Sequence, residues 1–233
     1  MARRAMLACV LSLMLSQPAE AAGVTVKGVT VGGVAATLLL PAKPHGAIIL
    51  LAGGDGNIGV GPDGAIARPG NQLVRTREAY AARGFAVLVP EGSVNVPEAV
   101  TFMRSYGKVT LVGTSRGTQR AARGIAAGAR PDRLVLTSGF LSDASGDTDN
   151  VEHILGSANL LPPTLIVHNK NDQCLKTQPA GVAPFLAWAG GRARVTWLAG
   201  GTSIGNPCEA RAYHGFNGID GQVVSAVVGF AAR

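Results

Sequence analysis

The sequence predicts one α/β domain with a mostly parallel sheet that is covered by helices on both faces. The chain of 233 residues is 47% hydrophobic and 15% charged, so it has enough apolar material for one sizeable core. From residue 46 onward, short apolar runs alternate with helical segments, which is typical of repeated strand-helix winding. Several of these runs are apolar without interruption, as strands are when both faces of a parallel sheet are buried.

The N-terminal residues have the order of a secretory signal peptide. A basic pair, Arg3 and Arg4, precedes an apolar stretch, and small residues ending at Ala21 follow it. We therefore expect residues 1–21 to be removed and residues 22–233 to form a single domain in the periplasm or outside the cell. A buried N-terminal helix is the alternative.

The mature chain is expected to begin with an antiparallel hairpin. Residues 24–31 and 34–40 are rich in β-formers and are separated by two glycines. Residues 46–51 are a continuous apolar run and predict the first buried strand. A long Gly-rich loop over residues 53–70 follows.

The rest of the chain alternates between expected helices and expected strands. The first of these helices ends before Gly84, and a glycine commonly follows a helix. The stretch 141–163 has a weaker pattern, with room for one short helix, so no large lid is expected. The expected helices cover residues 71–83, 97–106, 117–129, 183–189 and 221–232. The expected strands cover residues 85–89, 109–112, 133–137, 164–168 and 193–198.

Residues 113–117 have the pattern G-x-S-x-G between an expected strand and an expected helix. This setting is typical of a nucleophile elbow, in which glycines allow a tight turn that exposes the serine hydroxyl. The pattern predicts Ser115 as a nucleophile and the backbone N–H of Arg116 as an oxyanion donor. The alternative is a Gly-rich turn with an incidental serine.

Where a nucleophile elbow carries a catalytic serine, an acid and then a histidine follow along the chain, so an acid and a base are expected after Ser115. His214 follows the last expected strand and is predicted as the base. Asp172 lies just beyond the strand 164–168 and is the preferred acid. Asp143, which follows the preceding strand, is the rival. His168 ends an apolar strand, where a packed histidine is expected.

The cysteines support this choice of acid. Export would remove Cys9 with the signal and leave Cys174 and Cys208, an even pair that predicts a disulfide. The bridge would close about 35 residues and stabilise the fold by roughly 4 kcal/mol. It would also tie the loop of Asp172 to the loop of His214. No Cys-x-x-Cys or histidine pair stands near the cysteines, so no metal is expected.

Three segments carry a resemblance to a known group of proteins. They are Ala52-Gly53-Gly54-Asp55-Gly56-Asn57, residues 112–117 and residues 206–218. Together they resemble secreted bacterial α/β-hydrolase-fold proteins related to dienelactone hydrolases and small esterases. The resemblance covers nearly all of the mature chain. It implies a triad of serine, aspartate and histidine, and a second oxyanion N–H from Gly54 or Asp55. The loop lacks the His-Gly pair that is common in this superfamily.

Two other functions compete with this one. Residues 54–59 match the G-x-G-x-x-G of dinucleotide-binding folds, but no helix is expected to open at Gly59 and the nearest strand-end acid, Glu91, is too distant. An exported oxidoreductase is therefore disfavoured, and no cofactor is expected. A binding protein that has the hydrolase fold without its chemistry is the stronger alternative.

The net charge of +7 comes mostly from scattered arginines, without the basic block that nucleic-acid binding requires. No apolar run beyond the N-terminus is long enough to span a membrane. Arg116, Arg120 and Arg123 recur at helical spacing, either as a solvated face or as a ligand-facing stripe; Arg116 could then bind a substrate carboxylate. The expected function is hydrolysis of a small-molecule ester, lactone or thioester through an acyl-enzyme on Ser115.

Overall fold

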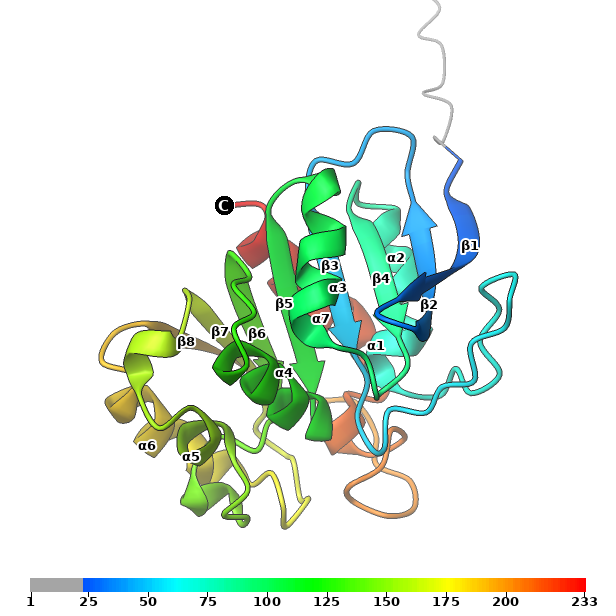
Figure 1. Ribbon diagram of the computed structural model, residues 1–233. Coiled ribbons are helices and arrows are strands. Elements are labelled where there is room, and N and C mark those ends of the chain that lie inside the picture. The colour runs from blue at the N-terminus through cyan, green and yellow to red at the C-terminus, as the bar shows by residue number, and fades with distance from the viewer. Residues whose placement is uncertain (1–22) are drawn as a thin grey trace, which may run out of the picture.

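A computed structural model describes residues 23–233 (Figure 1), so the expected signal peptide, residues 1–21, lies outside the described residues. The centre of the molecule is an eight-stranded sheet in the order β1-β2-β4-β3-β5-β6-β7-β8. All of the strands that the sequence predicts are present. Their bounds are β1 Thr25–Val31, β2 Val34–Leu40, β3 Ala47–Leu51, β4 Ala86–Pro90, β5 Val109–Thr114, β6 Arg133–Thr137, β7 Thr164–Asn169 and β8 Ala193–Leu198.

The sheet is antiparallel at its N-terminal edge and parallel elsewhere. Strand β1 pairs with β2 and β2 pairs with β4, both antiparallel, while every neighbouring pair from β4 to β8 in the sheet order is parallel. The hairpin turns at Gly32 and Gly33, whose φ angles of 57° and 78° suit a two-residue turn that requires positive φ at both positions. The predicted hairpin is therefore confirmed.

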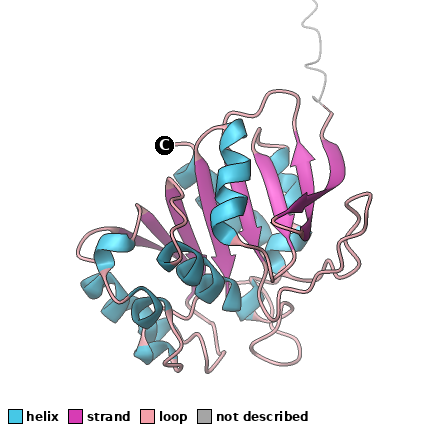
Figure 2. Cartoon of the chain, in the orientation of Figure 1, coloured by secondary structure: helices cyan, strands magenta, loops and turns pink. Residues whose placement is uncertain are grey.

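Helices cover both faces of the sheet, as Figures 1 and 2 show. On one face lie α3 (Val96–Met103), α4 (Arg116–Ala126), α5 (Val151–Leu155) and α6 (Val182–Trp188). On the other lie α1 (Gln72–Arg75), α2 (Arg77–Ala81) and α7 (Asp220–Ala231). Strand β3 is apolar throughout because both of its faces are buried. Ile49 packs against the first group of helices, and Ile48 and Leu50 pack against the second.

One helix differs in detail from the expected elements. The helix expected over residues 71–83 is divided into α1 and α2 at Thr76, whose ψ of 1° leaves the helical range. The Thr76 hydroxyl donates to the carbonyl of Gln72 at 2.8 Å, a local bond that competes with helix continuation. The connection between β6 and β7 contains α5 and two 3₁₀ turns, so its size agrees with the expectation of no large lid.

The carboxyl ends of the parallel strands meet at one edge of the sheet, where ligands bind in open α/β folds. The long loop after β3 is fixed there by Glu91, which follows β4. Its carboxylate accepts hydrogen bonds from the N–H groups of Ile58 (2.8 Å) and Val60 (2.6 Å). Within residues 23–233, no helix is both long and apolar enough to cross a membrane.

Candidate active site

Ser115 stands at the sharp turn between β5 and α4. Its φ of 51° and ψ of −125° are unusual for a residue with a side chain. A Cβ on Gly113 would collide with the carbonyl of Gly117, and a Cβ on Gly117 would collide with the carbonyl of Leu51. Both glycines of the motif are thus required by close backbone approach. The strained backbone is held by a 3.0 Å hydrogen bond from the Ser115 N–H to the carbonyl of Thr137.

The loop after β3 lies directly against this turn. A Cβ on Gly53 would stand 3.2 Å from Cβ of Ser115. Gly54 lines the same pocket as Ser115, whereas Asp55 lines a neighbouring pocket. Of the two residues expected to supply the second oxyanion donor, Gly54 is therefore the better placed. The N–H of Arg116 is the first of α4 and has no acceptor within that helix.

Arg120 fastens this loop to α4. Its guanidinium donates to the carbonyl of Gly54 at 3.0 Å and also to the carbonyl of Ala52. Burial lowers the pKa of Arg120, and the nearby carboxylate of Asp55 acts in the opposite direction. The role of Arg120 is thus neither of the two expected for the arginine stripe: it fixes the backbone beside Ser115.

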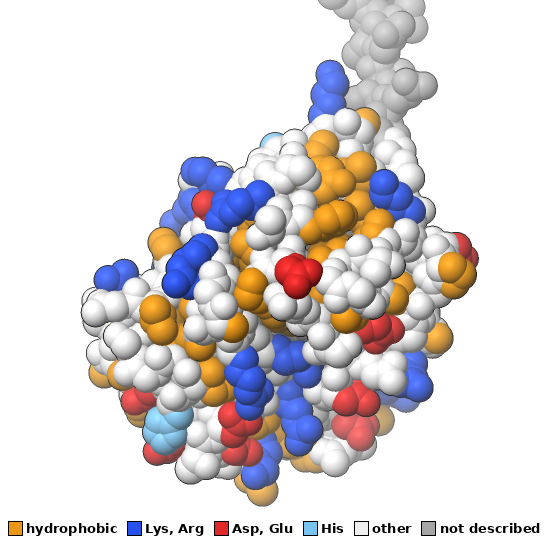
Figure 3. Space-filling model, viewed as in Figure 1, with side chains coloured by type: hydrophobic (Ala, Val, Ile, Leu, Met, Phe, Trp, Pro, Cys, Tyr) orange, Lys and Arg blue, Asp and Glu red, His pale blue; other side chains and the backbone are white. Residues whose placement is uncertain are grey.

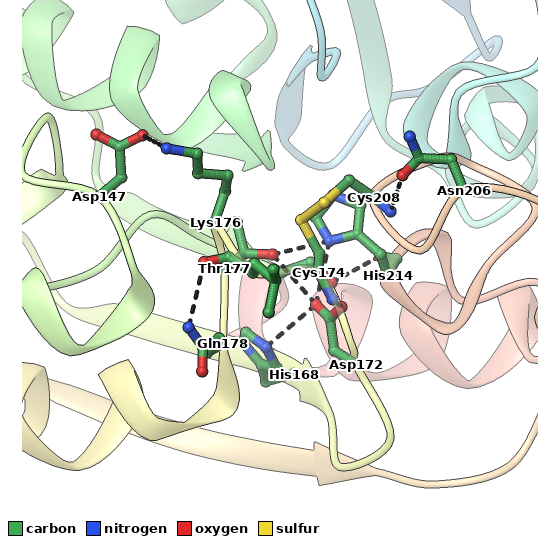
Figure 4. Close-up of a disulfide and its surroundings, with 12 residues drawn as sticks. Asp147, His168, Asp172, Cys174, Lys176, Thr177, Gln178, Asn206, Cys208 and His214 are labelled. Atoms are coloured by element: carbon green, nitrogen blue, oxygen red, sulfur yellow. Dashed lines mark hydrogen bonds and ion pairs between the residues drawn. A yellow bond between two sulfur atoms is a disulfide. The ribbon is translucent and has the colours of Figure 1, made fainter.

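Asp172 and His214 form a buried hydrogen-bonded pair, shown in Figure 4. Oδ2 of Asp172 lies 3.1 Å from Nδ1 of His214, and the two residues are 6% and 4% exposed. The second carboxylate oxygen of Asp172 accepts a 2.9 Å hydrogen bond from the N–H of Cys174. The structure therefore brings together the acid and the base that the sequence singles out.

The pKa of Asp172 determines which nitrogen of His214 carries the proton. Burial acts to raise this pKa, but the neighbouring imidazoles of His168 and His214 and the N–H of Cys174 outweigh burial and hold the pKa at about 2. The ionised carboxylate can only accept, so Nδ1 of His214 is the protonated nitrogen and Nε2 is free to accept a proton. This is the tautomer that a general base requires.

Thr177 contacts both members of the pair and was not predicted from the sequence. Its buried Oγ1 lies 2.9 Å from Nδ1 of His214 and 3.3 Å from Oδ2 of Asp172. The hydroxyl can donate to the carboxylate and accept from Nδ1. His168 is fully buried, as expected, but it also lies beside the acid, with Nε2 3.4 Å from Oδ2 of Asp172. The spacing of four residues between His168 and Asp172 was the only feature of the sequence that could have indicated this contact.

Three side chains hold the backbone around His214, and no sequence pattern pointed to them. Ser138, itself at a positive φ of 41°, donates from Oγ to the carbonyl of His214 at 2.7 Å. Nδ2 of Asn169 donates to the carbonyl of Tyr213 at 3.3 Å. Arg75 donates to the carbonyl of Gly215 at 2.7 Å. These contacts fix the main chain of residues 213–215 and thereby the position of the His214 imidazole.

Cys174 and Cys208 form a disulfide, with Cα atoms 4.5 Å apart and a sequence separation of 34. The bridge joins the loop of Asp172 to the segment that leads to His214 (Figure 4). Cys208 also lines the pocket that contains Ser115, so the bridged segment forms part of the wall.

Ser115 and His214 line one pocket of about 240 Å³ at the carboxyl edge of the sheet. The hydrogen bonds of the described residues do not include one between Ser115 Oγ and the imidazole. Such bonds are often long before substrate binds and shorten in the reacting complex. The described residues contain no cluster of three metal-ligating side chains.

The rival acid, Asp143, lies in a different environment. Its side chain is 61% exposed, accepts from Asn150 at 2.8 Å and stands 3.5 Å from Nε2 of His153. It contacts a different histidine from the one in the pocket.

Arg116 and Arg123 line a second pocket of about 380 Å³ beside the first, where Arg123 pairs with Asp149 at 2.6 Å. Figure 3 shows basic and acidic side chains interspersed over the lower part of the face in view.

The sequence matches no protein-family profile and no curated protein sequence. Solved structures nevertheless share its fold. Dienelactone hydrolase from Anabaena variabilis matches with a TM-score of 0.60 at 15% identity, over 88% of this chain and 94% of that one. An esterase/lipase from an uncultured bacterium gives 0.59 at 16% identity, over 93% and 86%. XC6422 from Xanthomonas campestris, an α/β serine hydrolase without a lid, gives 0.58 at 12% identity, over 88% and 92%.

These likenesses show that the chain has the α/β-hydrolase fold. Its structural neighbours include α/β serine hydrolases, among them a dienelactone hydrolase and esterases. The fold class predicted from the sequence is confirmed, and the short connection between β6 and β7 agrees with the lidless neighbour.

Proposed function

We propose that the protein is a serine hydrolase that cleaves a small ester, lactone or thioester through an acyl-enzyme on Ser115. The observation that carries this proposal is the buried pair of Asp172 and His214, because His214 lines the same pocket as a serine on a strained strand-to-helix turn. A nucleophile, a base and an orienting carboxylate in this arrangement serve acyl transfer on several unrelated folds.

The proposed reaction has two halves. Nε2 of His214 takes the hydroxyl proton of Ser115 as Oγ attacks the substrate carbonyl carbon. The N–H groups of Arg116 and Gly54 stabilise the negative oxygen. The bond to the leaving alcohol or thiol breaks, and His214 returns the proton to it. Water then attacks the acyl-enzyme with the same base and releases the acid and the free serine.

The size of the pocket and its neighbours support a small substrate. A volume of about 240 Å³ holds a short acyl or alcohol group, and no lid-sized insertion covers it. Esterases and a dienelactone hydrolase are among the structural neighbours. We propose a small-molecule acyl substrate with water as the acceptor, and no nucleic acid or membrane partner.

A binding protein that retains the fold is the second candidate. The lack of a Ser115–His214 hydrogen bond among the described residues is what favours it. Fluorophosphonate labelling separates the two, because this reagent reacts with an activated serine. We expect the wild type to be labelled and to hydrolyse short-acyl nitrophenyl esters, and Ser115→Ala to do neither. Ser225→Ala, which changes an exposed serine of α7, is the control and should behave as the wild type. Labelling that survives in Ser115→Ala would exclude Ser115 as the nucleophile.

We also propose that residues 1–21 direct export and that residues 22–233 are the mature domain, in the periplasm or outside the cell. A disulfide between Cys174 and Cys208 supports an oxidising compartment. N-terminal sequencing of the exported protein tests this proposal, and a sequence that begins at Ala22 is expected.

A further inference from the structure

Gln72, which lines the pocket of Ser115, has a buried side-chain amide without a hydrogen-bond partner among the described residues. Gln72 is the first residue of α1 and is 1% exposed. Neither Nε2 nor Oε1 has a partner among the described residues. Gln72 nevertheless lines the same pocket as Ser115 and His214. Buried amides are nearly always hydrogen-bonded. A partner for this amide is therefore expected from outside the described residues.

A second amide stands next to it. Oδ1 of Asn71 accepts from the N–H of Leu73 at 3.1 Å, which leaves Nδ2 facing the other way. Nδ2 lies 3.2 Å from the point where a Cβ on Gly53 would stand, and Cβ of Ser115 lies 3.2 Å from the same point. Asn71 also lines the pocket. Asn71 therefore places a polar group in the pocket wall close to Ser115, and Gln72 follows it in the chain.

We propose that Gln72 is a specificity-determining residue, and that its amide recognises a hydroxyl group near the scissile carbonyl of the substrate. This inference rests on the serine hydrolase function proposed above. The Gln72 side chain offers two donors and one acceptor, and a hydroxyl can pair with either kind. An ester whose acyl and alcohol groups are pure hydrocarbon would seal the pocket and leave the amide unpaired. Binding of such an ester is therefore disfavoured.

The alternative is that Gln72 is merely part of the fold. A structural glutamine would hydrogen-bond to the protein, and its loss would destabilise the chain. Replacing an unpartnered buried amide by an apolar group of similar shape is instead neutral or stabilising. Gln72→Met should therefore keep or raise the melting temperature. Gln222→Met, on the exposed side of α7, is the matched control.

The kinetic test compares esters that differ by one hydroxyl. Ethyl 3-hydroxybutyrate against ethyl butyrate places the hydroxyl on the acyl side, and 2-hydroxyethyl butyrate against ethyl butyrate places it on the alcohol side. We expect the wild type to prefer one hydroxylated ester by about tenfold or more in kcat/KM. Gln72→Met should lose this preference, while Gln222→Met should retain it.

A binding test needs no turnover. In Ser115→Ala, the preferred hydroxylated ester should raise the melting temperature more than ethyl butyrate does, and the added Gln72→Met change should remove the difference. Equal kcat/KM values in the wild type, an unchanged preference in Gln72→Met, or a large loss of stability in Gln72→Met would each overturn the proposal. Failure of the serine hydrolase function has a different signature, since then no ester is turned over and no fluorophosphonate is incorporated.

Discussion

Asp172 and His214 are hydrogen-bonded at 3.1 Å although 42 residues separate them in the chain. Asp172 follows β7, while His214 lies in a 3₁₀ turn after β8, on a segment that does not pair with the sheet. The pairing therefore depends on contacts that hold this segment in place: a hydroxyl from Ser138, a guanidinium from Arg75 and the disulfide at Cys208. Loosening any one of them should reduce turnover before it unfolds the sheet.

Loss of the Asp172 carboxylate should abolish most of the activity. Asp172→Asn can no longer stabilise the charged imidazole or fix its tautomer, and the same change in a well-studied serine protease triad costs about 10⁴ in kcat. We expect a loss of that order in ester turnover, with slow fluorophosphonate labelling retained.

Asp143→Asn is the control for this change. The Asp143 side chain is mostly exposed and pairs with His153, so its loss should leave turnover within about twofold of the wild type. Equal losses in the two variants would mean that neither carboxylate belongs to the triad.

The low pKa of Asp172 predicts how stability depends on pH. Its folded-state pKa of about 2 is below the ordinary value of 3.8, so the unfolded chain takes up the proton first as the pH falls. Asp172 should thus contribute about 2 kcal/mol to the free energy of unfolding above about pH 4, and lose it as the pH falls to about 2. Urea denaturation between pH 2 and pH 6 measures this. The slope should be smaller in Asp172→Asn than in the wild type.

The fold was predictable because its signals are local. Each strand of the parallel part is a short apolar run, and residues such as Ile48 and Ile49 are buried on opposite faces, so periodicity and length were enough to find them. The break between α1 and α2 was not predictable, since it depends on one side-chain hydrogen bond of Thr76. Strand order also was not specified, because it depends on contacts between distant segments.

The candidate site was predictable only in part, for the same reason. Ser115 has a local motif, and Asp172 and His214 have positions relative to strands. Ser138 and Thr177 have neither, since a serine or threonine in a loop is common and its partner lies 76 or 37 residues away in the chain. Such residues are identified by the three-dimensional contacts they make.

The disulfide should matter more for turnover than for the integrity of the sheet. Cys174 and Cys208 join the loop of Asp172 to the segment of His214, while neither contributes to a strand. Reductant, or the double variant Cys174→Ala/Cys208→Ser, should lower the free energy of unfolding by about 2–4 kcal/mol. Turnover should fall as well, while Ser115 is still labelled slowly.

The double variant is also the control for reductant, because reductant should then have no further effect on it. Intact-mass measurement of the exported protein should show no free thiol at either position. Two free thiols, or full activity in reductant, would contradict the role of the bridge.

The last prediction concerns Arg75, whose guanidinium uses all five of its N–H donors. Two go to the carboxylate of Asp220, and the others go to the carbonyls of Gly70, Ala210 and Gly215 at 2.7–3.2 Å. The ammonium of Arg75→Lys keeps the charge but has three donors at one point, so it cannot hold acceptors on three separate segments. We expect kcat to fall by about 10- to 100-fold with little change in KM, because the carbonyl next to His214 loses its anchor. Arg104→Lys alters an exposed pair with Asp132 and should change kcat by less than about twofold. If both variants keep the wild-type kcat, the position of His214 does not depend on Arg75.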